Sequence, residues 1–259
     1  MLKKRIIPKL LLKNGRNVKG VRFEALRDTG SPVTNARIYD AQGADELIFL
    51  DISASVEGRQ ILYDTITRTA AEVFMPFCVG GGVRTVEDIR GLLRAGADKV
   101  SINTEAIDRP ALLADGAAQF GVQCMVVSID FRRHGPACKV YTHGGTVATG
   151  VDVLDHARRC VELGAGEILL TSIDRDGTMT GYDIELTHAV SEAVDVPVIA
   201  SGGAGTLQHL CDAIQEGGAS AVAVGSLFHF TDQSPIKARA HMRGRGIDVR
   251  SARTGTTSI

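Results

Sequence analysis

Several common signatures are missing from this sequence, and each absence excludes a class of protein. Lysine plus arginine (29) nearly balance aspartate plus glutamate (30), so the net charge of −1 gives no reason to expect a nucleic acid or an anionic membrane as partner. No apolar run approaches the roughly 20 residues of a membrane span. Pro8 and Lys9 interrupt the apolar N-terminal run, which is too short for a secretory signal. We therefore expect a cytoplasmic protein.

The five cysteines form no recognisable framework. Their number is odd, and no two have the C-x-x-C spacing of a redox or zinc motif. We interpret them as buried, reduced thiols. The glycine clusters also lack the G-x-G-x-x-G pattern, so a dinucleotide-binding fold has little support. We expect neither a metal site nor a cofactor.

Short apolar runs alternate with amphipathic patterns along the whole chain. The predicted strands are 5–11, 46–51, 76–79, 99–103, 123–130, 167–172, 196–200 and 220–224. The predicted helices are 31–43, 59–74, 85–95, 109–120, 151–163, 184–193, 206–217 and 234–244. This alternation is typical of a parallel sheet covered by helices.

The two halves of the chain repeat each other at an offset of 121 to 122 residues, from Ala44 to Ala165 and from Gly96 to Gly218. An open, doubly wound sheet has no reason to repeat at half length, whereas a barrel of two half-barrels does. We predict a single α/β domain, a (βα)8 TIM barrel over residues 1–248 with half-barrels of about 1–122 and 123–248. Residues 249–259 are predicted to be a polar, frayed tail.

Two connections are longer than the others and occupy equivalent places in the two halves. Residues 12–29 follow the first strand and residues 131–150 follow the fifth. Long loops at the carboxyl ends of barrel strands usually belong to the face that carries the active site. We predict that both segments are loops on that face.

Four charged residues begin predicted strands at the opposite, N-terminal face: Arg5, Glu46, Lys99 and Glu167. The alternation of side chains along a strand allows all four to point into the barrel. From the residues alone, a structural ring of ion pairs is the favoured interpretation, because this face usually serves stability. A gate to the barrel interior is the alternative.

Glycine clusters follow three strands, at 80–82, 202–205 and 225. Glycine lets the backbone approach a ligand, and free N–H groups at a helix start favour phosphate. Two clusters half a barrel apart suggest a ligand with a phosphate at each end, although tight turns alone would explain any one of them. For the polar segment 172–178, surface-loop and substrate-contact interpretations stay equally open.

Three segments, LLTSIDRDGTMTGYD at 169–183, IASGGAG at 199–205 and DKVSIN at 98–103, carry a specific resemblance. The chain resembles the cyclase subunit of imidazole glycerol phosphate synthase from Lys4 to about Phe230. The resemblance implies a duplicated half-barrel that receives ammonia from a glutaminase docked on the N-terminal face. The ammonia attacks a bisphosphorylated ribulosyl intermediate, giving imidazole glycerol phosphate and an aminoimidazole carboxamide ribotide in histidine biosynthesis.

The resemblance also implies residue roles. Arg5, Glu46, Lys99 and Glu167 match an ammonia gate, Asp98 matches a contact to the glutaminase, and Asp130 matches a catalytic carboxylate. The implied substrate- and phosphate-binding positions are Lys19, which closes on the substrate, and Gly81, Gly82, Asn103, Thr104, Thr171, Asp176, Gly177, Gly202, Gly203, Gly225 and Ser226.

One position departs from the family pattern. The second catalytic aspartate is replaced by Leu11, and Asn14 also stands where an acid is usual. The ring closure needs one group to donate a proton and another to remove one, and a single carboxylate cannot readily do both. Losing such a group typically costs about a hundredfold to ten-thousandfold in rate.

A paralogous branch with leucines at this place accompanies a glutaminase-like partner and an N-acetyl-sugar amidotransferase in surface-polysaccharide (lipopolysaccharide) biosynthesis. We expect a cyclase-impaired member of this branch that supplies ammonia for sugar amidation. The alternatives are a genuine cyclase in which Asp130 shares the work with Asp176, and a non-enzymatic docking scaffold for the glutaminase.

Lys9 is a second unusual residue. Its parity places the side chain inside the barrel, about 13 Å along the strand from Arg5. A buried lysine is costly unless it is paired, and Asp130 is the expected partner, which would be held ionised. The alternative is a shifted first strand that turns Lys9 outward.

Overall fold

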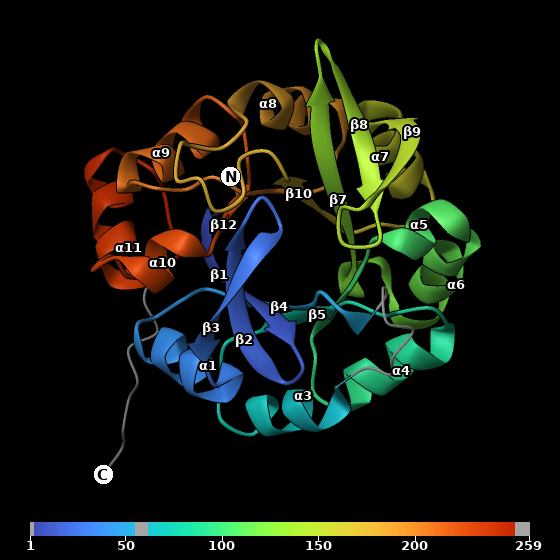
Figure 1. Ribbon diagram of the computed structural model, residues 1–259, viewed down its shortest axis with the longest axis horizontal. Helices are drawn as coiled ribbons and strands as arrows, with labels where there is room; N and C mark the ends of the chain where they lie inside the picture. The colour runs from blue at the N-terminus through green and yellow to red at the C-terminus, as the bar shows by residue number, and fades with distance from the viewer. Residues whose placement is uncertain (1–2, 55–61, 252–259) are drawn as a thin grey trace.

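The computed structural model describes residues 3–54 and 62–251, and parallel strands close into a barrel within them (Figure 1). The eight barrel strands are β1 (Arg5–Lys13), β4 (Leu47–Asp51), β5 (Phe77–Gly80), β6 (Lys99–Ile102), β7 (Met125–His134), β10 (Glu167–Ser172), β11 (Val198–Ser201) and β12 (Ala221–Val224). Each pairs with the next in this order, and β12 pairs with β1, which closes the ring. The predicted (βα)8 barrel is confirmed.

Helices surround the strands. They are α1 (Pro32–Ala41), α3 (Tyr63–Ala70), α4 (Val86–Arg94), α5 (Thr104–Asp108), α6 (Ala111–Phe120), α7 (Val153–Glu162), α8 (Ile184–Ala193), α9 (Leu207–Gln215), α10 (Ser226–Phe230) and α11 (Pro235–Gly244), with a 3-10 turn η1 (Val122–Cys124). The predicted helix 109–120 is confirmed as α6, whereas the short helices α5 and α10 were not predicted. The start of the predicted helix 59–74 lies outside the described residues.

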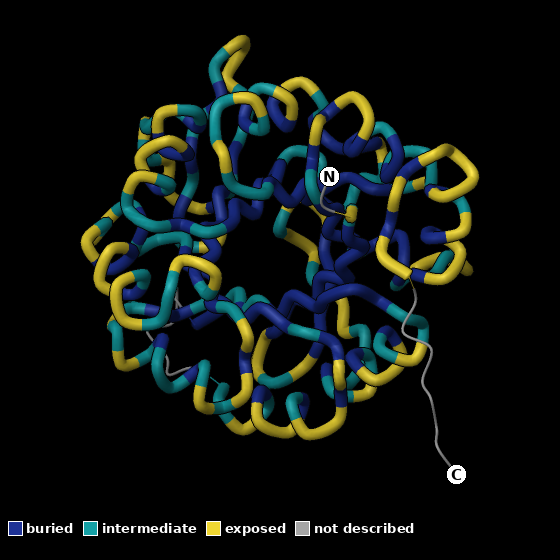
Figure 2. The backbone as a smooth tube through the Cα atoms, turned by 180° about the vertical axis from the view of Figure 1, so that it is seen from behind, coloured by how far each residue is buried: buried dark blue, intermediate teal, exposed yellow. Residues whose placement is uncertain are grey.

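Side chains alternate along each strand, so that they contribute to two separate hydrophobic cores. One set of strand residues, such as Ile6 and Leu10, packs outward against the helices. The other set fills the middle of the barrel with apolar side chains: Ile7, Ile48, Cys78, Val126, Leu169, Ile199, Ala221 and Ala223. Figure 2 shows the buried backbone around the axis and the exposed turns at the periphery. The barrel interior is therefore a packed apolar layer.

The two long segments predicted as loops are β-hairpins. β2 (Arg16–Val21) and β3 (Glu24–Gly30) extend β1, and β8 (Ala137–Thr142) and β9 (Val147–Asp152) extend β7. The turn after β1 is Asn14-Gly15, where both residues have positive φ angles of 51° and 72°, as a two-residue type I′ turn requires. The loop prediction was wrong because an Asn-Gly pair is a strong local signal for a β-hairpin. The hairpins occupy equivalent places in the two halves, and the one formed by β7 and β8 projects beyond the helices in Figure 1.

The first residues of the predicted frayed tail are ordered. Val249 is buried and forms a bridge with Lys4, whose N–H donates to the Asp248 carbonyl at 2.9 Å. The Arg250 N–H donates to the Lys4 carbonyl at 3.2 Å, so residues 249–250 continue the barrel beside the first strand. The rest of the predicted tail, 252–259, lies outside the described residues.

All five cysteines are free thiols, and four of them, Cys78, Cys138, Cys160 and Cys211, are buried as interpreted, whereas Cys124 is partly exposed. None of the helices in the described ranges combines the length and the apolar character needed to cross a bilayer.

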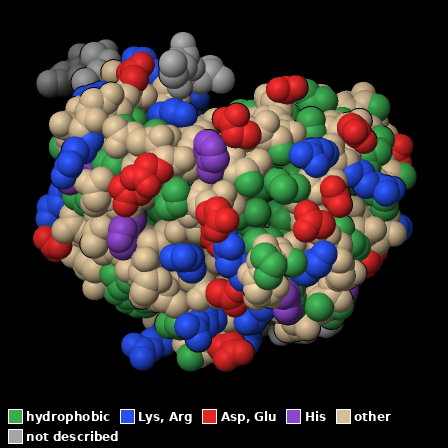
Figure 3. All heavy atoms as spheres, turned by 90° about the horizontal axis from the view of Figure 1, so that it is seen from above, with side chains coloured by type: hydrophobic (Ala, Val, Ile, Leu, Met, Phe, Trp, Pro, Cys, Tyr) green, Lys and Arg blue, Asp and Glu red, His purple; other side chains and the backbone are tan. Residues whose placement is uncertain are grey.

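On the face shown in Figure 3, acidic and basic side chains are interspersed.

Candidate functional site

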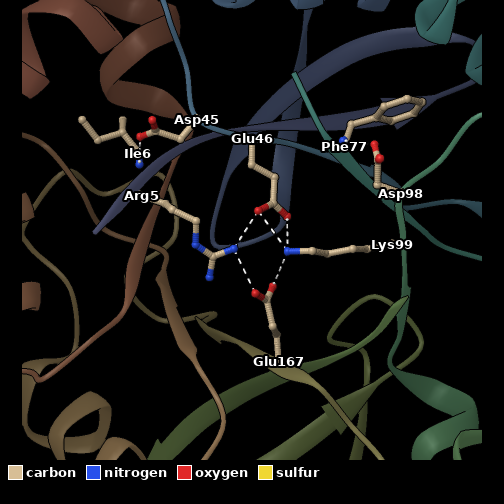
Figure 4. Close-up of polar contacts among 8 residues, drawn as sticks. All are labelled: Arg5, Ile6, Asp45, Glu46, Phe77, Asp98, Lys99 and Glu167. Carbon is tan, nitrogen blue, oxygen red and sulfur yellow. Dashed lines mark hydrogen bonds and ion pairs between the residues drawn. The ribbon is translucent and has the colours of Figure 1, made fainter. Parts of the chain in front are cut away.

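A closed ring of four charged side chains occupies the N-terminal end of the barrel (Figure 4). The Arg5 guanidinium contacts Glu46 at 2.7 Å and Glu167 at 2.9 Å. The Lys99 ammonium contacts Glu46 at 3.0 Å and Glu167 at 2.9 Å. Cations and carboxylates alternate, so each group has two partners of opposite charge. The predicted inward orientation of all four is confirmed.

In this ring, burial and the neighbouring carboxylates shift the pKa values of the two cations in opposite directions. Burial alone would lower the pKa of Lys99, but the Glu46 and Glu167 carboxylates outweigh it and hold the pKa above its usual value. The pKa of Arg5 is raised in the same way, against its own burial. The two carboxylates thus favour the charged form of both cations in the ring.

Asp98 lies beside this ring at the same end of the barrel. Its side chain is exposed, and its carboxylate accepts the Phe77 N–H at 2.9 Å, which fixes its orientation (Figure 4). Asp45 accepts the Ile6 N–H at 2.8 Å in a similar contact, but it is buried against Arg239. Of these two acids, Asp98 is therefore the one that can meet another molecule.

A cavity of about 350 Å³ opens at the other end, where the barrel strands finish. Two predicted glycines, Gly81 and Gly82, line it, as do Asn103 and Thr104. The volume is within the range of about 300–1,000 Å³ that is typical of small-molecule sites. Leu11 and Asp130 line the same cavity, so the two positions predicted to form an acid pair do face one space.

Asp130 lies beside several polar groups. Asn103 Nδ2 lies 3.3 Å from its Oδ2, and the hydroxyls of Thr171 and Ser128 act to lower its pKa. Burial raises the pKa of Asp130 from 3.8 to about 6, although the Lys9 ammonium opposes the rise. A carboxyl with such a pKa exchanges its proton near neutral pH.

Lys9 points into the barrel, as predicted, but its predicted ion pair with Asp130 is wrong. Its Nζ donates to Ser201 Oγ at 2.7 Å and lies 3.5 Å from Asp176 Oδ2. Asp176 takes this place because the loop after β10 folds inward, with the Asp176 N–H bonded to the Ser172 carbonyl at 2.9 Å. Nor does Lys9 hold the pKa of Asp130 below its usual value, since the effect of burial on this pKa exceeds that of Lys9.

Lys19 and Asp176 meet at the barrel mouth, where Asp176 lines both the large cavity and a second, much smaller one. Lys19 projects from β2 and is buried, with its Nζ 2.5 Å from Asp176 Oδ1. Burial alone would raise the pKa of Asp176, but the two lysines outweigh it and lower the pKa. The cavity beside this pair has a volume of only about 10 Å³; its lining includes Gly177, Gly202, Gly203, Gly225 and Ser226.

Gly81 and Gly202 occupy equivalent turns at the mouth, one in each half of the repeated chain. Their φ angles are +97° and +87°, a conformation that other residues rarely adopt. A Cβ on Gly81 would lie 2.0 Å from the Asp51 carbonyl oxygen, and one on Gly202 would lie 2.6 Å from that of Ser172. Each glycine therefore lets one strand-end turn pack directly on the neighbouring strand.

The structure thus places the predicted residues in two groups. The ring and Asp98 lie at the N-terminal end, whereas Asp130, Leu11, Lys19 and the glycine turns lie at the mouth. The sequence reasoning missed Ser201, the hydrogen-bond partner of Lys9. Strand parity could have found it, because Ser201 shares the inward face of β11 with Ile199 and directly precedes a glycine turn.

The family assignment follows from a match to a known family model. The model of the family described as histidine biosynthesis protein matches residues 5–234, which is nearly the whole chain. The chain belongs to this family. Within the described ranges of this family member, no group of three or more histidine, cysteine or acidic side chains is arranged to hold a metal ion.

Proposed function

We propose that this protein is the ammonia-accepting barrel subunit of a glutamine amidotransferase complex and that it is a poor cyclase. In this proposal the ammonia serves the amidation of an N-acetyl sugar in polysaccharide biosynthesis. The observation that carries the proposal is the pairing of an intact charged ring with Leu11. Leu11 lines the mouth cavity opposite the ring, where the resembled cyclase has its second acid.

Asp176 is a poor substitute for the second acid, whose position is occupied by Leu11. Asp176 also lines the cavity, but Lys9 and Lys19 hold it as an ion pair and lower its pKa. A carboxylate with a lowered pKa stays ionised at neutral pH and is a poor proton donor. This argues against the alternative of an ordinary cyclase in which Asp130 and Asp176 share the proton transfers.

The N-terminal face supports the proposed glutaminase contact. Asp98 is exposed there beside the ring, and Phe74 and Val122 are exposed in the segments that lead into β5 and β7, with 84% and 51% of their surfaces accessible. Large apolar side chains with nearby charges are typical of interface anchors. We propose that the glutaminase covers this face.

The decisive experiment measures ring closure directly. The purified protein is given saturating ammonium and the ribulosyl substrate, and imidazole glycerol phosphate is quantified. We expect turnover about a hundredfold or more below that of a member with both acids. Leu11→Asp is expected to restore turnover. The matched variant Leu11→Asn has the same shape as Leu11→Asp but cannot transfer the proton, so it is expected not to restore turnover. Normal turnover by the unmodified chain would refute the cyclase-impaired assignment.

The closed ring favours a second candidate, a scaffold that only docks and stimulates the glutaminase. Ala223→Leu distinguishes the two, because it fills the barrel interior and leaves the N-terminal face unchanged. If the barrel conducts ammonia, this variant should bind the glutaminase and support glutamine hydrolysis while transferring less nitrogen to the acceptor. Nitrogen transfer at the unmodified level, from a correctly folded variant, would favour the scaffold.

A further inference from the structure

We propose that Lys9 is a nucleophile that forms an imine with the open-chain carbonyl group of a phosphorylated sugar bound in the mouth cavity. Neither the ring closure nor the passage of ammonia requires such a step. The inference does not rest on the proposed function, because it concerns the isolated barrel and needs neither a glutaminase nor ammonia.

The position of Lys9 is the first argument. The side chain reaches from β1 above the apolar layer of the barrel and lines both the cavity of about 350 Å³ and the cavity of about 10 Å³. Only 3% of the residue is accessible, so the amine meets a ligand in the cavity rather than bulk water. Ser201 Oγ at 2.7 Å orients it.

The charges around Lys9 are the second argument. Asp176 is nearer to Lys19 (2.5 Å) than to Lys9 (3.5 Å), so Lys9 is the less tightly held of the two amines. Burial lowers the pKa of Lys9, and the Lys19 charge lowers it further, while Asp176 and Asp130 offset part of the effect. A lysine that is desolvated and lies beside a second cation is a recognised kind of activated amine nucleophile.

A group that can carry the proton lines the same cavity as the amine. Asp130 lines the same cavity, and its pKa of about 6 lets it give and take a proton near neutral pH. In the proposed step, the neutral Lys9 nitrogen attacks the carbonyl carbon and the carbonyl oxygen gains a proton. The resulting carbinolamine loses that oxygen as water while the C=N bond forms. One carbonyl and one amine thus give one imine and one water, and Asp130 returns to its starting state.

The cavity walls define the class of ligand. Gly81 and Gly82 line the mouth cavity with backbone that carries no side chain, and Gly81 has the positive φ that opens its turn. Such turns accommodate phosphate oxygens on backbone N–H groups. Lys9 and the glycines line one space, which fits a short molecule with a carbonyl at one end and a phosphate at the other.

The test is reductive trapping with dihydroxyacetone phosphate as the probe. The protein is incubated with this ketone and cyanoborohydride, and its intact mass is measured. Imine formation and reduction together add the mass of the probe less one oxygen atom. We expect one such addition per chain and a modified Lys9 in peptide mapping. Unphosphorylated dihydroxyacetone should label at least about tenfold less.

Two variants provide controls. Lys9→Arg keeps the positive charge without the nucleophile and should lose the label, whereas Lys139→Arg, on the outer hairpin, should keep it. Absence of label, label on surface lysines with Lys9 unmodified, or equal labelling of Lys9→Arg would each overturn the proposal. The mapping of the unmodified chain decides the question even if Lys9→Arg does not fold.

Discussion

Lys19 Nζ lies 2.5 Å from Asp176 Oδ1, and this buried contact joins the β2–β3 hairpin to the loop after β10. A second contact supports it, since the Arg22 N–H donates to the Asp176 carbonyl at 2.7 Å. Gly177 lies directly against Gly20, where a Cβ would come within 2.2 Å of the Gly20 carbonyl oxygen. The hairpin is thus fastened over one side of the barrel mouth.

Lys19→Met should release this hairpin and destabilise the protein. The substitution leaves the buried Asp176 carboxylate with Lys9 as its only remaining ion-pair partner in the described part of the chain, at 3.5 Å. Breaking a buried pair costs about 3–5 kcal/mol, and we expect the lower end because Lys9 remains. Urea unfolding measures the loss. Lys13→Met, at an exposed lysine of the neighbouring strand, is the control and should change little; equal stability of the two variants would contradict the prediction.

Arg5→Leu should cost far more stability than Arg16→Leu. Arg5 joins two carboxylates in the buried ring, and its removal leaves Glu46 and Glu167 facing a single ammonium, for a loss of about 3–5 kcal/mol. Arg16 pairs with Asp28 at 2.8 Å, but both side chains are more than half exposed, so that loss should be within about 1 kcal/mol. The two variants are compared by their denaturant midpoints. Similar midpoints would show that the ring contributes no more to the free energy of unfolding than the exposed pair.

Asp130→Asn should stabilise the protein in a pH-dependent way. The folded state raises the pKa of Asp130 from 3.8 to about 6, so folding becomes less favourable as the pH rises between these values and the buried carboxyl ionises. Asparagine does not ionise. We expect a gain on the order of 3 kcal/mol at pH 8 and none below about pH 4, because a tenfold change in proton affinity corresponds to about 1.4 kcal/mol.

Urea titrations at several pH values between 4 and 8 test this prediction. Asp28→Asn is the control of opposite sign, because its hydrogen bonds to Arg16 lower the pKa of that exposed carboxyl. This control should therefore be slightly less stable than the parent above about pH 4. A gain for Asp130→Asn that is the same at pH 4 and pH 8 would contradict the raised pKa.

Gly81→Ala and Gly202→Ala should both be destabilising. Each new Cβ would meet a backbone carbonyl oxygen, at 2.0 Å and 2.6 Å respectively, and each residue would keep a positive φ. Such strain costs about 1–3 kcal/mol, and the shorter contact should make Gly81→Ala the worse variant. Thermal unfolding measures both. Gly244→Ala at the end of α11, with no atom within 4 Å of the new Cβ, should be neutral or stabilising.

Strand parity predicted the parts of this molecule that depend on regular strands. It placed Arg5, Glu46, Lys99 and Glu167 at one end and Asp130 at the other, because side chains alternate wherever a strand is continuous. The helix starts after the glycine turns were predicted equally well, since Thr85 and Thr206 cap α4 and α9 with their side chains.

The acidic partner of Lys9 could not be predicted in the same way. Asp176 lies in an irregular loop, and its inward fold depends on a turn whose geometry has no period in the sequence. The hairpins were missed for a different reason. The segments were assigned as loops from their length and position, whereas Asn14-Gly15 is a local turn signal that indicates a hairpin.

The β2–β3 hairpin is held over one side of the barrel mouth, so the two sides of the mouth differ although the chain is internally duplicated. One side of the mouth presents about 350 Å³ of ready space, and the other presents about 10 Å³, room for a single water molecule. An anion that enters the smaller cavity needs more room than this, so its apparent affinity is reduced by the free energy of opening. Ligands with two anionic ends would therefore bind in a fixed order, with the larger cavity first and the smaller cavity after it opens.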